Sequence, residues 1–204
     1  MQESTNILIK SLLISTGRSG IMELLDHMEQ CGFYNAPCSS KYHLSTPGGL
    51  AEHSYNVCEK ALEIATALYG EENLSIEFLD SIAICSLLHD IGKAGQFGKP
   101  NYKPEIHHEE AITPENANDP NIATENVSIV YASNENLLFV PHEIRSIAII
   151  SKFIELTEEE QFAILYHNGL YTDLGNAVKG KETPLYMILH FADMWASRVV
   201  ESEK

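Results

Sequence analysis

His89 and Asp90 stand side by side at the end of Ile82–Leu88, a run in which every residue except Ser86 is apolar. An imidazole and a carboxylate are costly to bury in such surroundings unless another group compensates them. A divalent metal ion does so, because neutral imidazole and ionised carboxylate are both its ligands and the ion supplies the missing positive charge. The pair therefore restricts the chain to folds that bring further ligands to the end of this run.

Apolar residues recur at helical spacing along most of the 204 residues, which predicts an all-α bundle. The helix starts carry recognisable signals: Ser19 as a cap, Thr157 with Glu160 as a capping box, and Thr183 followed by proline at the first helical position. Pro141 also suits a first helical position. The predicted helices cover residues 20–31, 50–69, 75–91, 141–154, 157–168 and 183–196.

Two regions depart from this pattern. Residues 98–126 are polar, rich in proline and too long for an ordinary connection, so we expect a lid or a surface insertion. Val127–Tyr131 and Leu137–Val140 are short apolar segments around a polar turn, and they predict a small β-hairpin. We expect one domain over residues 1–204, with an N-terminal part at 1–40, a core at 41–97 and 127–200, and the insertion at 98–126.

Two further potential ligands lie on separate predicted helices. His53 falls on the apolar stripe of its helix, and Asp193 lies one turn beyond a leucine of the apolar stripe of the last helix, so both are expected to face inward. Ligands on different helices can converge inside a bundle. With His89 and Asp90 they provide two nitrogen and two oxygen donors, which suit manganese, iron, cobalt, nickel or zinc better than calcium.

A second ion depends on two more histidines. His142 stands at the start of a predicted helix, and His167 lies near the end of another. If both join the cluster, a second ion would lie about 3.5–4 Å from the first, with Asp90 as the bridging ligand. Each also has an ordinary explanation: His142 as an exposed residue of a first helical turn, and His167 as a helix-end residue favoured by the helix dipole. The sequence leaves one or two ions open.

The residues around these ligands match a known family. The strings Gly48-Gly-Leu-Ala-Glu-His53, Leu88-His-Asp-Ile-Gly-Lys93 and Leu189-His-Phe-Ala-Asp193 resemble those of the HD-domain metal-dependent phosphohydrolases. The similarity runs from about residue 41 to 196 and leaves the insertion unmatched. His142 and His167 resemble the added histidines of a subset whose core is similar to that of bacterial 3′→5′ exoribonucleases. The resemblance does not extend to the nucleic-acid-binding domain of those enzymes.

The resemblance implies an all-helical HD-domain fold and hydrolysis of a phosphoester bond in a nucleotide-like substrate. One or two divalent transition-metal ions would activate water and neutralise charge on the phosphoryl oxygens. His89 and Asp90 would take part directly in catalysis, and Lys93 would hold a phosphate as a point charge unless it is an ordinary solvated lysine at a helix end. Two alternatives stay open: an exoribonuclease-like phosphodiesterase acting on short RNA or DNA ends, and a non-catalytic HD-fold sensor or binding module.

The formal charge of −16 opposes the binding of long nucleic acids, so we expect a small phosphorylated substrate as the partner. A polymer substrate would require a basic track toward the metal, for which the candidates are Lys41, Lys93, Lys99, Lys103 and Arg145. No apolar run approaches the roughly 18 residues that span a bilayer, and the N-terminal residues do not resemble a secretion signal. We therefore expect no membrane association.

We interpret the cysteines as reduced thiols of a cytoplasmic protein, because none are spaced as Cys-x-x-Cys. They are Cys31, Cys38, Cys58 and Cys85. The apolar segment Ile7–Ile14 could pair with a second copy in an oligomer or pack on the core of its own chain. Lys41 and His43 precede the helix of His53 and could line the mouth of a substrate site, although exposed loop residues are the default.

Overall fold

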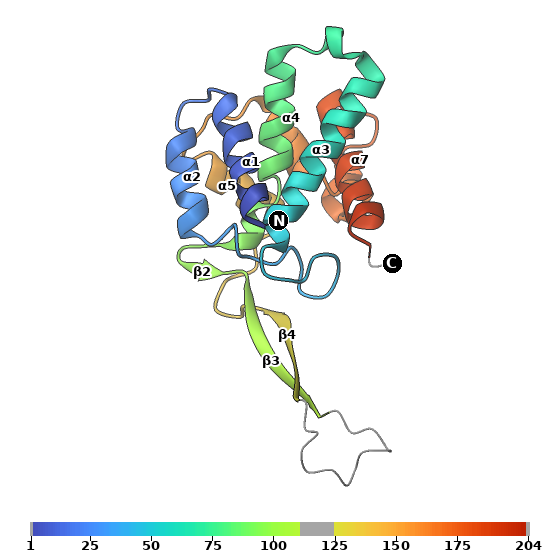
Figure 1. The fold of residues 1–204 in the computed structure, drawn as a ribbon. Helices are drawn as coiled ribbons and strands as arrows, with labels where there is room; N and C mark the ends of the chain where they lie inside the picture. The colour runs from blue at the N-terminus through green and yellow to red at the C-terminus, as the bar shows by residue number, and fades with distance from the viewer. Residues whose placement is uncertain (1, 111–124, 203–204) are drawn as a thin grey trace.

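The computed structural model describes residues 2–110 and 125–202, and this part of the chain contains seven α-helices. They are α1 (Gln2–Ser15), α2 (Ile21–Gln30), α3 (Gly49–Tyr69), α4 (Ile76–Leu88), α5 (His142–Ile150), α6 (Glu158–Tyr166) and α7 (Pro184–Trp195). The helices gather into one body from which a two-stranded arm projects (Figure 1). The all-α prediction is confirmed. Residues 111–124 of the predicted insertion lie outside the described residues.

Helix α4 lies within the body and contacts α1, α3, α6 and α7. Its sequence explains this position: every residue of Ile82–Leu88 is buried, so the helix has no solvent face along this stretch. Ser75 caps its first turn. The helix is followed by the 3-10 turn η2 (Ile91–Ala94), and His89 and Asp90 lie at the junction between the two.

Helix α1 packs against α2, α3 and α4. Ile9 and Leu13 are fully buried there, whereas Ile7, Leu8 and Ile14 are at least 44% exposed. The N-terminal apolar segment thus covers the core of its own chain. Across the two described ranges, no helix is both long enough and apolar enough to cross a bilayer.

The helix caps follow the sequence signals at two of three positions. Thr157 begins α6 with a capping box, and Thr183 caps α7. Ser19 is wrong as the cap of α2, because Gly20 is the N-cap residue and has a φ of 88°. A Cβ at Gly20 would lie 1.9 Å from the backbone oxygen of Phe153, so the entry to α2 requires glycine.

The arm is an antiparallel hairpin of β3 (Tyr102–Glu110) and β4 (Glu125–Ser133), and it is drawn below the helical body in Figure 1. A small β-hairpin in this region is therefore confirmed, but its strands are not the predicted pair. The predicted strand Val127–Tyr131 lies within β4, whereas Leu137–Val140 forms no strand.

The composition of β3 explains why the sequence did not predict it as the partner strand. β3 contains Pro104, which pairs with Tyr131 in the register of the hairpin. Each strand of a two-stranded hairpin has one unpaired edge, and such an edge accepts a proline that a central strand would not. Leu138 and Phe139 are instead 85% and 92% exposed in the connection to α5. Two shorter strands, β1 (Gly95–Gln96) and β2 (Lys99–Pro100), form a second hairpin.

Candidate metal centre

Three helices bring four predicted ligands to one point inside the body. His53 lies in the second turn of α3, His89 and Asp90 follow α4, and Asp193 lies in the last turn of α7. Because α3 packs against both α4 and α7, the side chains meet between these helices. His53, His89 and Asp90 are at most 1% exposed, and the Asp193 side chain is 17% exposed. We call these four residues the inner group.

The inner group is arranged around one oxygen of Asp90. Asp90 Oδ2 lies 3.4 Å from His89 Nε2 and 3.6 Å from His53 Nε2. His53 Nε2 also lies 3.3 Å from Asp193 Oδ1. Two imidazole nitrogens and two carboxylates therefore face one another at the end of the buried helix α4.

The other oxygen of Asp90 faces the two remaining histidines, which we call the outer pair. Asp90 Oδ1 is 3.2 Å from His142 Nε2 and 3.6 Å from His167 Nε2, and these two nitrogens are 3.3 Å apart. The other five side chains that the sequence suggested as ligands thus gather around the Asp90 carboxylate, four in direct contact with it and Asp193 through His53. Oδ2 of Asp90 faces the inner group, and Oδ1 faces the outer pair.

Gly92 allows α5 to approach η2 closely. A Cβ at Gly92 would lie 2.4 Å from the backbone oxygen of His142, so a larger residue would push the outer pair away from Asp90. The backbone N–H of Gly92 also donates a hydrogen bond to Ser146 Oγ at 2.9 Å. Pro141 is the N-cap residue of α5, one position before the predicted one, and His142 begins the helix.

Two of the buried histidines are oriented by backbone carbonyls. His89 Nδ1 donates to the carbonyl of Ser86 at 2.9 Å, and His167 Nδ1 donates to that of Ile164 at 2.7 Å. Because a carbonyl oxygen can only accept, Nδ1 carries the proton in both rings. These contacts leave each Nε2 directed toward Asp90.

His53 is oriented by a carboxylate that sequence reasoning missed. Both oxygens of Glu201 lie 3.0 Å from His53 Nδ1, and Asn56 donates to the same carboxylate at 3.0 Å. Glu201 follows the π-helix η5 (Ala196–Val200), and its side chain is 2% exposed. A carboxylate in this position fixes the orientation of a metal-binding histidine and raises its basicity.

Asn168 was also missed. Its amide nitrogen lies 3.0 Å from His167 Nε2 and 3.2 Å from His142 Nε2, and it donates to Glu143 Oε1 at 2.7 Å. Its amide nitrogen thus contacts both members of the outer pair. A single asparagine after a helix end has no spacing or composition signal that could have identified it.

Three atoms of the cluster are buried without a hydrogen-bond partner among the described residues: His53 Nε2, His89 Nε2 and Asp90 Oδ1. Buried polar atoms of native proteins nearly always have a partner, and an unpaired one costs about 1–3 kcal/mol. Imidazole nitrogens with free lone pairs and a facing carboxylate are the donors that divalent transition metals bind. The residues present therefore fit a metal ion.

Lys93 supplies positive charge beside the inner group. Its Nζ lies 2.6 Å from Asp90 Oδ2. Burial opposes ionisation of Asp90, but its charged neighbours, Lys93 foremost, outweigh it and hold the pKa of Asp90 well below its usual range. Burial is the main cause that lowers the pKa of His167 to about 3, so this imidazole is neutral and able to bind a cation.

A cavity of about 850 Å³ opens beside the inner group. Lys93, Asp193 and Glu201 belong to its wall on the side of the cluster, and Lys41 and His43 belong to the wall formed by the loop before α3. The two loop residues therefore line this cavity. A small molecule in this cavity would lie against Asp193, the candidate ligand that belongs to its wall, and against Lys93.

A family model described as HD domain matches residues 50–193. The chain therefore belongs to the HD-domain family, as its motifs indicated. HD domains are generally metal-dependent hydrolases that bind divalent metal ions, and the matched segment contains the inner group and the outer pair. Comparisons with curated proteins and with solved structures found no match.

Proposed function

We propose that this chain is a metal-dependent phosphohydrolase that cleaves a phosphoester bond of a small, nucleotide-like substrate. The observation that carries the proposal is the set of unpaired, buried donor atoms at His53, His89 and Asp90, which lies beside an open cavity. Unpaired buried polar atoms weaken a fold, so the set has no structural use in the bundle. It becomes useful when a cation and a substrate bind there.

The inner group would hold one ion and the outer pair a second, with Asp90 contributing one oxygen to each. The nitrogen and oxygen donors suit manganese, iron, cobalt, nickel or zinc. Such ions polarise a phosphoryl oxygen and lower the pKa of the water that attacks phosphorus.

The side chains of this protein prepare that chemistry in three ways. The acceptors on the Nδ1 side of His53, His89 and His167 hold each Nε2 toward Asp90. Lys93 lies in the cavity wall beside Asp90, where it supplies positive charge to an entering phosphate. The burial of the cluster excludes water from its inner side, which strengthens electrostatic interactions at the site.

The cavity favours a substrate of nucleotide size. About 850 Å³ lies within the range of small-molecule sites. Lys41 and Arg198 offer cationic groups for phosphate oxygens, and Tyr42 and Tyr171 offer aromatic rings for a base to stack on. We infer a substrate that carries both a phosphate and an aromatic ring.

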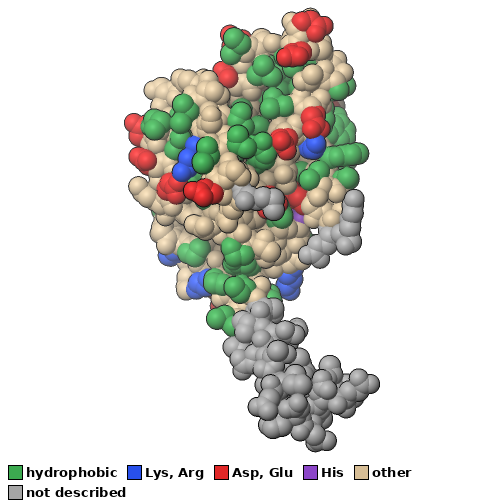
Figure 2. All heavy atoms as spheres, viewed as in Figure 1, with side chains coloured by type: hydrophobic (Ala, Val, Ile, Leu, Met, Phe, Trp, Pro, Cys, Tyr) green, Lys and Arg blue, Asp and Glu red, His purple; other side chains and the backbone are tan. Residues whose placement is uncertain are grey.

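The exoribonuclease-like alternative requires a basic track, and two of the five candidate residues, Arg145 and Lys99, are bound to backbone carbonyls instead. Arg145 is 3% exposed and donates to a backbone carbonyl at 2.9 Å. Lys99 donates to another backbone carbonyl, that of Asn136, at 2.9 Å. On the face in Figure 2, acidic side chains are spread over the helical body. These observations favour a small substrate over a polymer.

A substrate screen with a matched pair of variants tests the proposal. Protein loaded with Mn²⁺ is offered nucleoside monophosphates, cyclic nucleotides, cyclic dinucleotides and short RNA, and products are separated by chromatography. We expect turnover of a small nucleotide and a loss of roughly 10³-fold or more in Asp90→Asn. Asp26→Asn changes an exposed carboxylate of α2 and should retain full activity.

Each other outcome supports a different reading. Cleavage of RNA alone would favour the exoribonuclease-like alternative. Metal binding without hydrolysis of any compound, with each of the five metals supplied, would favour a sensor or binding module. Equal turnover by the wild type and Asp90→Asn would contradict the mechanism itself.

A further inference from the structure

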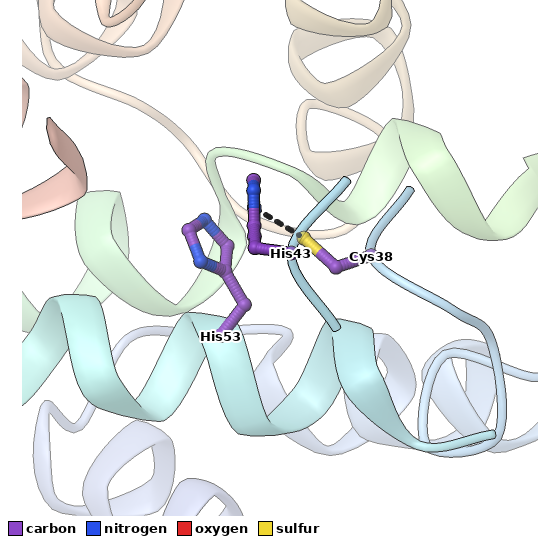
Figure 3. A group of neighbouring side chains, drawn as sticks. All are labelled: Cys38, His43 and His53. Carbon is purple, nitrogen blue, oxygen red and sulfur yellow. Dashed lines mark hydrogen bonds between the residues drawn. The ribbon is translucent and has the colours of Figure 1, made fainter. Parts of the chain in front are cut away.

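A thiol lies beside the metal centre at a place that no ligand pattern in the sequence marks. Cys38 and His43 belong to the loop between α2 and α3, and both lie close to His53 (Figure 3). Cys38 Sγ is 3.3 Å from His43 Nε2, and one donor atom from each of the three residues lies within 4.8 Å of the others. Cys38 is fully buried, whereas the His43 side chain is 21% exposed.

Glu201 brings a carboxylate to the same place. Its Oε2 is 3.7 Å from His43 Nε2 and 3.0 Å from His53 Nδ1, and its Oε1 accepts hydrogen bonds from His53 and Asn56. Oε1 can therefore keep its contact with His53 while Oε2 binds another partner. Cys38, His43 and Glu201 all lie outside residues 50–193, the segment that the HD-domain model matches.

The loop is folded so that the thiol and the imidazole face each other. The backbone N–H of Cys38 donates to the carbonyl of Leu44 at 3.0 Å, and Ser39 Oγ donates to the carbonyl of His43 at 3.0 Å. Leu44 has a φ of 48°, a left-handed conformation that is unfavourable for leucine. These contacts close a short turn that brings Cys38 and His43 together, with their side chains 3.3 Å apart.

We propose that Cys38, His43 and Glu201 form a second metal site, separate from the centre around Asp90, for a thiophilic divalent cation such as zinc. Tetrahedral zinc lies about 2.3 Å from sulfur and about 2.0–2.1 Å from nitrogen or oxygen, so two of its donors are roughly 3.3–3.6 Å apart. Cys38 Sγ and His43 Nε2 are 3.3 Å apart, and His43 Nε2 and Glu201 Oε2 are 3.7 Å apart. Both distances are close to those of a shared ion.

The proposed site selects a different cation from the Asp90 centre. The inner group and the outer pair offer imidazole and carboxylate donors, whereas Cys38 adds a sulfur donor, which favours zinc and other soft cations. Binding displaces the thiol proton to solvent and replaces the hydrogen bond between Cys38 and His43. His43 and Glu201 also line the cavity, so water or a ligand from the cavity can complete the fourth position. The inference does not rest on the proposed hydrolysis, in which the thiol takes no part.

Titration of the protein with Co²⁺ tests the site without an activity assay. A thiolate bound to Co²⁺ gives a near-ultraviolet charge-transfer band that imidazole and carboxylate ligands do not give. We expect this band in the wild type and its loss in Cys38→Ser. Cys58→Ser and Cys85→Ser change two other buried cysteines and should keep it. His43→Gln removes a donor without touching sulfur and should weaken Co²⁺ binding at this site by about tenfold or more.

Asp90→Asn separates this inference from the proposed function. The variant should lose turnover and keep the thiolate band, because Asp90 is not a donor of the second site. A wild type that gives no band at saturating Co²⁺, or a band that survives Cys38→Ser, would overturn the second site even if turnover is intact. Circular dichroism of each variant distinguishes loss of the site from loss of the fold.

Discussion

Two buried carboxylates, Glu160 and Asp90, lie in the same helical body and have opposite surroundings. Glu160 is fully buried, and Arg18 donates to both of its oxygens. Ser81 Oγ and the backbone N–H of Thr157 also donate to it, at 2.7 Å and 2.8 Å. The charge of Glu160 is balanced and its oxygens are paired within the protein, so this cluster needs no ligand.

The cluster around Asp90 is equally buried but is not complete. Lys93 contacts one oxygen of Asp90, yet the other oxygen and the Nε2 atoms of His53 and His89 have no hydrogen-bond partner in the described part of the chain. Burial alone therefore does not mark a functional carboxylate. A fully paired cluster stabilises the fold, whereas a cluster with open donor atoms is arranged for something that binds.

The largest expected difference between the two clusters is the response to a metal. Mn²⁺ at 100 to 1,000 times its dissociation constant should stabilise the wild type by about 2.7–4.1 kcal/mol, because the ion binds only the folded cluster. Asp90→Asn should lose most of this gain, and Glu160→Gln should keep it. Thermal unfolding with Mn²⁺ and after chelation measures the effect. Equal stabilisation of the wild type and Asp90→Asn would remove the distinction.

The next difference is expected in the metal-free protein. There the substitution of Glu160 should lower the free energy of unfolding more than the substitution of Asp90. Glu160→Ala leaves Arg18 and Ser81 without their partner and should lower the free energy of unfolding by about 2–4 kcal/mol. Asp90→Asn removes charge from an incompletely paired cluster and should cost less. Urea unfolding of both variants after chelation gives the comparison, and a larger loss in Asp90→Asn would show that Asp90 is primarily structural.

The contribution of Glu160 should also depend on pH. Burial opposes ionisation of Glu160, but Arg18 and the Thr157 backbone outweigh it and lower its pKa. A carboxyl with a lowered folded-state pKa contributes stability above its unfolded value of about 4.3, and this stability is lost as the pH falls through the folded-state value. The gap in unfolding free energy between the wild type and Glu160→Gln should thus shrink in acid. A constant gap would contradict this reading of the Glu160 cluster.

The smallest effect is expected at Glu201. Its carboxylate is hydrogen-bonded to His53 and Asn56, and it orients His53 in the cluster around Asp90. Glu201→Ala leaves His53 without its acceptor and should weaken Mn²⁺ binding by about 10–100-fold, with the number of bound ions unchanged. Equilibrium dialysis measures both quantities. Glu52→Ala, a change at an exposed residue next to His53, is the control. Wild-type affinity in Glu201→Ala would show that this carboxylate does not position His53.

Local sequence patterns predicted which residues of the Asp90 cluster face the interior of the bundle. His53 and Asp193 lie far apart in the chain, yet each was expected to face inward from its spacing along one helix, and the two side chains meet at 3.3 Å. The short string around His89 and Asp90 placed the pair at the end of a buried helix. Spacing along a helix determines which face a residue occupies, so these expectations needed no knowledge of tertiary contacts.

The residues that were missed depend on tertiary contacts or irregular backbone. Glu201 comes eight residues after Asp193, a spacing that differs by about 80° around a regular α-helix. The π-helix Ala196–Val200 lies between them and changes that relation. Cys38 and His43 lie in a loop, where no periodicity predicts the direction in which a side chain points. The segment Val127–Tyr131 was predicted as a strand but was assigned the wrong partner. The pattern of one segment identifies a strand but does not determine which strand it pairs with.

Anomalous X-ray scattering from crystals of the Mn²⁺-loaded protein tests most directly whether the Asp90 cluster holds metal. The account predicts two manganese peaks within coordination distance of the Asp90 carboxylate, one among the inner group and one beside the outer pair. Manganese bound elsewhere on the protein, with no peak within reach of Asp90, would contradict it.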